Sequence, residues 1–288
     1  MISIFSIPKP FLGRIETIQY NAIATWKTIH PKLEIILIGD VQGVRQAAKK
    51  YGCKHIKEIS KNKYQTPFIS DAFKKARATA KNEILMYSNC DMIYDQSLIT
   101  TVQSVPKDLK YLICGRRYDC ASSVKLYEKK AVDICQAVKK LKTKSELHGF
   151  SGIDYFIYAK KNSLKMPKFY VGRCCWDNWL IWAARKHEFI VIDATLNLNA
   201  LHQNHDYQSQ PLGDQRFKGP ELESNIQSCG SLSNMLTLRE AHLQMIHNKL
   251  YQPKGLLWFH SKIADNPVYQ KTLGLKRSIY FQIQKWRK

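Results

Sequence analysis

The chain has 288 residues, of which 44% are hydrophobic and 11% aromatic, a composition typical of a folded globular protein and not of a disordered or fibrous one. Its 45 Lys and Arg residues against 23 Asp and Glu residues leave a net charge of +22, which predicts an anionic partner such as nucleic acid, acidic lipid or a phosphorylated ligand.

No apolar run approaches the roughly 18 residues of a membrane span. The apolar start at 1–7 has no basic residues before it, so we interpret it as a strand and not a signal peptide. The cysteines form no C-x-x-C pair, which favours reduced thiols and a cytoplasmic location.

Strands and helices alternate along the first hundred residues. The apolar pattern predicts strands at 2–7, 33–38, 55–59 and 83–87, and helices at 15–26, 44–51 and 68–80. The runs at 33–38 and 83–87 are continuously apolar, as strands buried on both faces of a sheet are. We therefore predict an α/β fold with a mostly parallel central sheet and helices on both faces.

The second half of the chain is less regular. Its pattern predicts strands at 111–115, 155–159 and 189–192, helices at 125–142, 179–186 and 232–250, and a long loop over 200–230. No linker separates two units, so we expect one domain over 1–230 and a C-terminal helical extension over 231–288 that belongs to the same compact unit. The extension ends in a basic, aromatic tail at 276–288.

The residues that directly follow the predicted strands are the first candidates for a site, because ligands of parallel α/β sheets bind beyond the carboxyl ends of the strands. Carboxylates and basic groups alternate there: Pro8, Lys9, Asp40, Asn89, Asp91, Arg116, Arg117, Asp119 and Asp193. Oxygen ligands of this kind hold Mg²⁺ or Mn²⁺, and Arg or Lys neutralises phosphate. Taken singly, each Asp or Asn is also an ordinary turn residue. The glycine-rich phosphate loops of P-loop enzymes and dinucleotide oxidoreductases are absent from the sequence.

Five segments, in order, resemble a bacterial-type group of glycosyltransferases with the GT-A fold. They are ILMYSNCDMI at 84–93, GRRYD at 115–119, GIDYF at 152–156, GRCCWDNW at 172–179, and DAT at 193–195 with HQNHDY at 202–207. The first is similar to the Asp-X-Asp region of that fold, with Asn89 in place of the first acid, which weakens charge neutralisation at a bound cation. The resemblance covers about residues 1–230 and has no counterpart in the last 50 or so.

The resemblance implies an enzyme, a hexosyl- or pentosyltransferase, that moves a sugar from a nucleoside-diphosphate-sugar donor to a hydroxyl of a glycan or lipid-linked acceptor. It implies that Asp91, His202 and His205 hold Mn²⁺ or Mg²⁺, and that Asp177 is the general base of an inverting reaction. It assigns further donor contacts to Pro8, Asp40, Asp71, Asn89, Arg116 and Arg117, and acceptor or sugar contacts to Gly152, Asp154, Arg173 and Trp176. Attack by a hydroxyl on an anomeric carbon requires a base near the nucleophile and charge stabilisation on the departing diphosphate.

Simpler interpretations stand beside these roles. Asp177 precedes an apolar helical pattern and could be its N-cap. The histidine pair could be solvated in a loop. The eleven basic residues in 45–81 and the tail at 276–288 are typical of a solvated surface, or of peripheral docking to an anionic membrane face. The positive net charge is also consistent with a second function, nucleic-acid binding. The chain has no RRM, KH, zinc-finger or helix-turn-helix signature, however, and we expect no nucleic-acid partner. A sugar nucleotidyltransferase is a third alternative.

Overall fold

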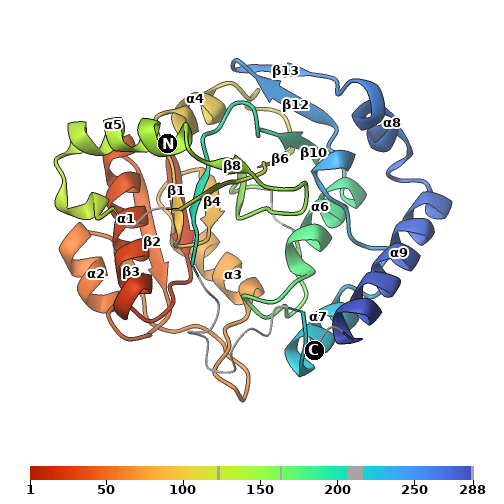
Figure 1. Cartoon of the computed structure of the whole chain (residues 1–288), viewed down its shortest axis with the longest axis horizontal. Coiled ribbons are helices and arrows are strands. Elements are labelled where there is room, and N and C mark those ends of the chain that lie inside the picture. Colours follow the sequence, from red (N-terminus) through yellow and green to blue (C-terminus); the bar gives the residue numbers. More distant parts are fainter. Residues whose placement is uncertain (122–123, 163, 206–216, 287–288) are drawn as a thin grey trace.

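The computed structural model describes residues 1–121, 124–162, 164–205 and 217–286 of the chain (Figure 1). A nine-stranded sheet crosses the molecule in the order β13-β12-β10-β6-β9-β4-β1-β2-β3. Its strands are β1 (Ile2–Ser6), β2 (Glu34–Ile38), β3 (Lys54–Ile56), β4 (Ile84–Ser88), β6 (Tyr111–Cys114), β9 (Tyr155–Ala159), β10 (Ile190–Asp193), β12 (Leu243–Ile246) and β13 (Lys249–Tyr251). Neighbours pair in parallel except where β9 lies between β4 and β6 and where β13 follows β12.

Helices cover both faces of this sheet. They are α1 (Gly13–Ile29), α2 (Val44–Tyr51), α3 (Ile69–Thr79), α4 (Ser97–Gln103), α5 (Ala131–Lys142), α6 (Trp176–Lys186), α7 (Pro220–Ser228), α8 (Gly255–Ile263) and α9 (Pro267–Trp286), with short 3₁₀ turns at Leu126–Glu128 and Leu238–Glu240. Helices α3, α6 and α7 share one buried apolar cluster, and α1, α2 and α4 share a second. The predicted fold class, a mostly parallel sheet with helices on both faces, is confirmed.

The strands explain why there are two clusters. Because successive side chains of a strand point to opposite faces, Ile4 and Met86 enter the cluster with α1, whereas Phe5 and Leu85 enter the cluster with α3. All four are fully buried. A continuous apolar run is therefore needed to cover both faces, which is why the sequence pattern of β2 and β4 was informative.

A smaller sheet lies beside the carboxyl ends of the main strands and joins distant parts of the chain. Its order is β5-β11-β7-β8, from β5 (Met92–Ile93), β7 (Tyr118–Cys120), β8 (Glu146–Leu147) and β11 (Leu201–Gln203). Strand β11 pairs antiparallel with β5 and parallel with β7. This pairing brings residues near position 202 against residues near positions 92 and 119.

Two sequence predictions in the C-terminal half were wrong. The helix expected at 232–250 is instead a 3₁₀ turn followed by the hairpin β12–β13, whose two turn residues His247 and Asn248 have φ angles of 47° and 62°. Such left-handed pairs are the usual turns of two-residue hairpins, and Asn is among the residues that tolerate them. The loop expected at 200–230 contains β11 and α7; its central part, 206–216, lies outside the described residues.

The structure adds β12 to the edge of the main sheet through parallel pairing with β10. Strands from both sides of residue 230 therefore belong to one sheet. None of the helices in the described ranges is both long enough and apolar enough to cross a bilayer.

Candidate active site

A cavity of about 860 Å³ opens at the carboxyl ends of β1 and β4. Many of the residues that the sequence singled out line it together: Pro8, Asn89, Asp91, Arg117, Gly152, Asp154, Arg173, Trp176, Asp177, His202 and His205. They come from positions spread over almost 200 residues, and the sheet brings them to one edge, as expected for a parallel α/β fold. Cavities of this size accommodate small organic ligands.

Asp91, His202 and His205 form a compact group of metal-ligand atoms. The Oδ2 atom of Asp91 lies 3.2 Å from Nε2 of His205 and 3.8 Å from Nε2 of His202, and the ligand atoms of all three lie within 4.8 Å of one another. The side chains are 13%, 5% and 2% exposed for Asp91, His202 and His205 respectively. The pairing of β11 with β5 sets His202 opposite Met92, which is why it reaches Asp91.

The group fits a divalent cation. The Oδ1 atom of Asp91 is buried and has no hydrogen-bond partner among the described residues, so a carboxylate oxygen is left to bind something else. One carboxylate and two imidazoles are a mixed donor set, which suits Mn²⁺ better than Mg²⁺, because Mg²⁺ strongly favours oxygen ligands.

The surrounding charges keep Asp91 ionised. Burial on its own would raise the pKa of Asp91, but His202, His205 and Lys9 outweigh it and hold the pKa well below its usual range. The Nζ atom of Lys9 lies 3.3 Å from Nε2 of His205, so a cationic group stands directly beside the cluster. The anionic form needed for metal or cation binding is therefore the stable form at neutral pH.

Asn89 is not one of the groups gathered round Asp91. Its side-chain amide donates to Oδ1 of Asp154 at 2.5 Å, and its carbonyl oxygen accepts from the Tyr87 hydroxyl at 2.8 Å. Arg117 then bridges Asp154 at 2.7 Å and Asp119 at 2.9 Å. The amide that stands in place of an acid thus begins a hydrogen-bonded network along the floor of the cavity.

The network continues to the histidines through Asp119. Its Oδ2 atom lies 2.6 Å from Nδ1 of His148, and its Oδ1 atom lies 3.5 Å from Nδ1 of His202. A carboxylate that accepts a hydrogen bond from one ring nitrogen of a histidine fixes the orientation of the ring. The other ring nitrogen is then available to bind a metal. In His202 that other nitrogen is the Nε2 atom that faces Asp91.

Asp177 lies on a different element of the same cavity, in the first turn of α6. The helix begins at Trp176 and its N-cap is Cys175 at φ 92°, so the alternative prediction that Asp177 caps the helix was wrong by two positions. The Asp177 carboxylate accepts the backbone N–H of Asn178 at 2.9 Å. Burial raises its pKa to about 7, which the hydrogen bond opposes and the nearby Asp154 reinforces. A carboxylate with a pKa near neutrality can accept a proton at neutral pH.

Arg173 and Trp176 are held by the protein core at the cavity wall. The Nη2 atom of Arg173 lies 2.6 Å from Oε2 of Glu221, and both side chains are almost fully buried. The Trp176 ring meets Tyr87 edge-on, with ring centroids 5.3 Å apart, and is 6% exposed. Trp176 is therefore mainly a packing residue of the wall.

Three predicted donor residues lie outside this cavity. Asp40 is exposed and forms an ion pair with Lys57 at 3.6 Å. Asp71 accepts the backbone N–H of Ser60 at 2.7 Å and lines a second cavity. Arg116 donates to the backbone oxygen of His148 at 2.6 Å, and its guanidinium lies 4.5 Å from the centre of the Phe150 ring.

Sequence reasoning missed several residues in the cavity or in the network beside it. Lys9 and Asp119 were noted at strand ends but given no role, and His148 was not singled out. The C-terminal helix contributes Arg277, Tyr280 and Phe281 to the lining, where we expected only a surface tail. Tyr280 and Phe281 follow Arg277 by three and four positions, so the three side chains lie on one side of α9. This helical spacing could have been recognised in the sequence.

The comparisons with known proteins give structural likenesses only. No family model matches the chain, and no curated protein sequence is similar to it. Among solved structures, glucosyl-3-phosphoglycerate synthase from Mycobacterium tuberculosis in complex with Mg²⁺ and UDP is similar, with a TM-score of 0.46 and 14% identity over 80% of this chain and 79% of that one. Its complex with Mn²⁺ and UDP-glucose has a TM-score of 0.46 and 12% identity over 80% and 79%. S. aureus TarS 1–349 has a TM-score of 0.41 and 12% identity over 71% of this chain and 58% of that one.

Proposed function

We propose that the chain is a glycosyltransferase of GT-A type that moves a sugar from a nucleoside-diphosphate-sugar donor to a hydroxyl group of a glycan or lipid-linked acceptor. One observation carries the proposal: a cation-binding group at Asp91 and a carboxylate with a near-neutral pKa at Asp177 line the same cavity. Asp91 and Asp177 both lie close enough to the Tyr87 hydroxyl to raise its pKa. Charge stabilisation and a base are the two requirements of the reaction.

Asp91, His202 and His205 would hold the cation on the donor side. When bound, Mn²⁺ would neutralise the charge that develops on the departing diphosphate. Lys9, beside His205, supplies a fixed positive charge at the same place and attracts the diphosphate whether or not the ion is bound. This arrangement offsets the charge lost where Asn89 replaces an acid.

Asp177 would act on the acceptor side. Its carboxylate accepts the proton of the attacking hydroxyl as the bond to the anomeric carbon forms, and the bond to the diphosphate oxygen breaks on the opposite face. A single displacement of this kind inverts the anomeric configuration. Arg117, which is fixed by Asp119 and Asp154, and Arg173, which is fixed by Glu221, are rigid donors for the hydroxyls of the sugar or acceptor.

The deciding experiment is a thermal-shift series with UDP, GDP, CDP, ADP and dTDP, each with and without Mn²⁺. One nucleoside diphosphate is expected to raise the unfolding temperature by several degrees, because a ligand at about 100 times its Kd stabilises a fold by about 2.7 kcal/mol. Asp91→Ala should abolish the metal-dependent part. Asp108→Ala, at an exposed acid away from the cavity, is the matched control.

The same series, together with an assay of the released products, separates the alternatives. Stabilisation by a polynucleotide, equal in wild type and Asp91→Ala and absent with every nucleoside diphosphate, would replace the transferase with the nucleic-acid-binding protein. Release of pyrophosphate from a nucleoside triphosphate and a sugar phosphate would favour the nucleotidyltransferase. Release of a nucleoside diphosphate from the donor is the result that the transferase requires.

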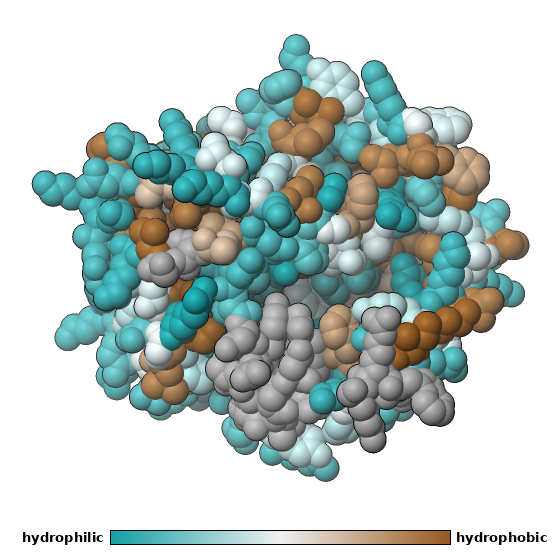
Figure 2. All heavy atoms as spheres, viewed as in Figure 1, coloured by the Kyte–Doolittle hydropathy of each residue, from teal (hydrophilic) through white to brown (hydrophobic). Residues whose placement is uncertain are grey.

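We further propose that α8 and α9 place the enzyme on an anionic membrane face. Leu275, Ile279 and Ile283 recur at helical spacing along α9 and are 64%, 49% and 47% exposed. Figure 2 shows hydrophobic side chains gathered along the edge of the molecule where α9 lies. Neither helix contains an acidic residue, and a cationic helix with one apolar side is typical of a peripheral membrane contact. Arg277 and Phe281 line the cavity from the opposite side of α9, so the helix would lie between the membrane face and the cavity.

A further inference from the structure

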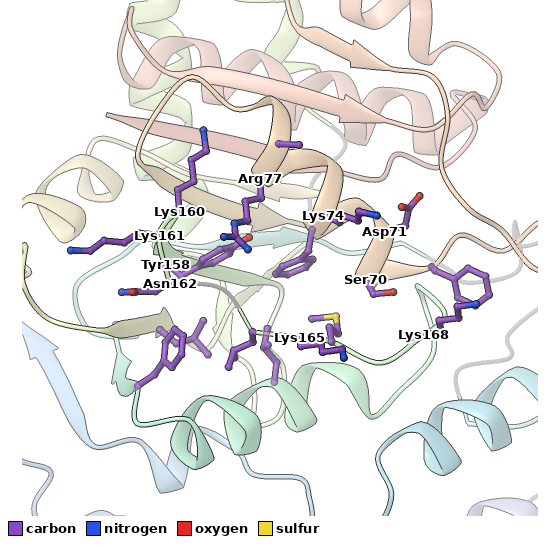
Figure 3. A pocket seen from close by; sticks show the side chains of 18 of the residues that line it. Ser70, Asp71, Lys74, Arg77, Tyr158, Lys160, Lys161, Asn162, Lys165 and Lys168 are labelled. Atoms are coloured by element: carbon purple, nitrogen blue, oxygen red, sulfur yellow. The ribbon is translucent and has the colours of Figure 1, made fainter.

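A second cavity, of about 930 Å³, lies between α3 and α6 (Figure 3). Leu112 of β6 and Tyr158 of β9 form its floor, and the segments 160–162 and 164–168, which follow β9, form part of its rim. It shares no lining residue with the candidate active site. An inference about this cavity is therefore independent of the proposed transferase.

The rim of this second cavity is strongly basic. Lys74 and Arg77 come from α3, and Lys160, Lys161, Lys165 and Lys168 come from the segments after β9, as Figure 3 shows. Asp71 and Glu83 are the acidic residues in the described lining, and Asp71 is already bonded to the Ser60 N–H at 2.7 Å. Two stretches of chain about 80 residues apart therefore bring their positive charges to one opening, which favours a ligand with concentrated negative charge.

Some of these basic side chains make contacts within the protein, and others form no ion pair with a carboxylate of the described residues. Lys160 donates to the backbone oxygen of Ala80 at 2.7 Å, and Lys168 lies 5.7 Å from the centre of the Phe68 ring. In the described parts of the chain, no ion pair joins Lys74, Lys161 or Lys165 to a carboxylate. Exposed lysines of this kind can bind phosphate as point charges.

The wall beneath the lysines is apolar and combines aliphatic with aromatic side chains. Leu112 and Leu180 are 2% exposed, and Leu164 and Met166 pack against the same core cluster. The aromatic rings offer few free faces. The Phe73 ring lies between Tyr87 and Tyr158, with centroids 5.5 Å and 5.8 Å away and interplanar angles of 22° and 6°. A flat nucleobase would find little to stack on, whereas an aliphatic chain would bury apolar area.

We propose that this second cavity binds a phosphate monoester that carries an aliphatic chain. The phosphate is held at the rim by Lys74, Lys161 and Lys165, and the chain lies along Leu164, Met166 and Leu180. The class of ligand follows from the charged rim and the apolar wall taken together. Inorganic phosphate alone would leave the apolar wall uncovered. A neutral aliphatic chain alone would bring no negative charge to the lysines.

The test uses the full chain and three probes: octyl phosphate, inorganic phosphate and 1-octanol, each titrated by calorimetry at fixed ionic strength. Octyl phosphate is expected to bind at least about tenfold more tightly than either of the others, because both the charge and the chain contribute. The double variant Lys74→Glu/Lys165→Glu should weaken octyl phosphate by about tenfold or more. Lys139→Glu/Lys140→Glu, an equal change of charge on the exposed face of α5, should weaken it far less.

Further variants locate the binding. Asp91→Ala should leave the affinity for octyl phosphate unchanged, since Asp91 belongs to the other cavity. Met166→Asn should weaken octyl phosphate and not inorganic phosphate, because it makes the apolar wall polar without changing its charge. Equal affinities for octyl phosphate and inorganic phosphate would overturn the proposal, as would an equal loss in the two double variants.

Discussion

The Nε2 atom of His205 lies 3.2 Å from Oδ2 of Asp91, although 114 positions separate the two residues in the chain. The contact exists because β11 pairs with β5 immediately after Asp91, and the backbone N–H of Gln203 donates to the Asp91 carbonyl oxygen at 3.2 Å. A short antiparallel pairing thus creates the group that we assign to the cation.

Removal of a histidine should weaken Mn²⁺ binding. His202→Ala and His205→Ala each remove one of three ligand atoms, and we expect a loss of at least about tenfold in affinity, since even residues that only orient a ligand affect metal affinity tenfold to a hundredfold. Electron paramagnetic resonance of free Mn²⁺ measures the binding directly. His187→Ala, at the exposed end of α6, should bind as wild type does. Wild-type affinity in both site variants would show that the ion binds elsewhere.

The transfer rate should rise with pH as Asp177 loses its proton. Its pKa is about 7, so kcat/KM measured at saturating metal should increase about tenfold per pH unit well below that value and level off above it. Asp177→Asn should lower kcat by about 10² to 10⁴ and remove this limb of the profile. An unchanged profile in Asp177→Asn would assign the base to another group.

The same substitution should stabilise the fold at neutral pH. The pKa of Asp177 is about 7 in the folded chain and 3.8 in the unfolded one, so the folded state binds more protons between these values and loses stability as the pH rises through that window. Asp177→Asn removes the cost of keeping this carboxylate charged inside the protein. The free energy of unfolding should therefore rise by roughly 1–2 kcal/mol above pH 7, a figure reduced from the full pKa shift because the side chain is partly exposed. Urea unfolding at pH 8 and pH 4 measures the gain. It should shrink toward pH 4, and a gain that grows toward acid would contradict the assignment.

Breaking the buried pair of Arg173 and Glu221 should destabilise the protein. Loss of one partner leaves a buried charge, which costs about 3–5 kcal/mol, whereas removal of both costs much less. Arg173→Met and Glu221→Leu should each lower the stability, and the double variant should recover part of the loss in a double-mutant cycle. Glu221 also accepts from the Asn62 side chain at 2.5 Å, so Glu221→Leu should be the more damaging single change. Additive losses would show that the two side chains are not coupled.

The apolar side of α9 should carry binding to anionic vesicles. Ile279→Asp adds charge to a side chain that is 49% exposed on α9, and Val132→Asp makes the same change at a side chain that is 68% exposed on α5. In co-sedimentation with vesicles that contain phosphatidylserine, we expect Ile279→Asp to lower the bound fraction severalfold and Val132→Asp to leave it near wild type. Equal binding by both variants would remove α9 from the membrane contact.

Local pattern sufficed for most of the first half of the fold and for some elements of the second half. The predicted helix at 44–51 and strand at 155–159 have the bounds of α2 and β9, because apolar periodicity reports directly which side chains are buried. The hairpin β12–β13 was missed because its strands have only four and three residues, too few to show alternation, and its stability comes from pairing with β10. A strand of that length depends on its neighbours more than on its own residues.

The chemistry of the site divides in the same way. The position of Asp91 after a buried strand was enough to identify it as a candidate, since residues at the carboxyl ends of parallel strands meet at one edge of the sheet. Asp177 and the histidine pair were identified by the resemblance of their segments to those of GT-A glycosyltransferases. Tertiary packing alone decided that Asn89 turns to Asp154 and that Asp40, Asp71 and Arg116 lie outside the cavity. It also decided that one side of α9 lines the cavity. Periodicity tells which residues are buried, but burial, distance and pKa depend on which distant segments pack together, and those contacts form only in the folded chain.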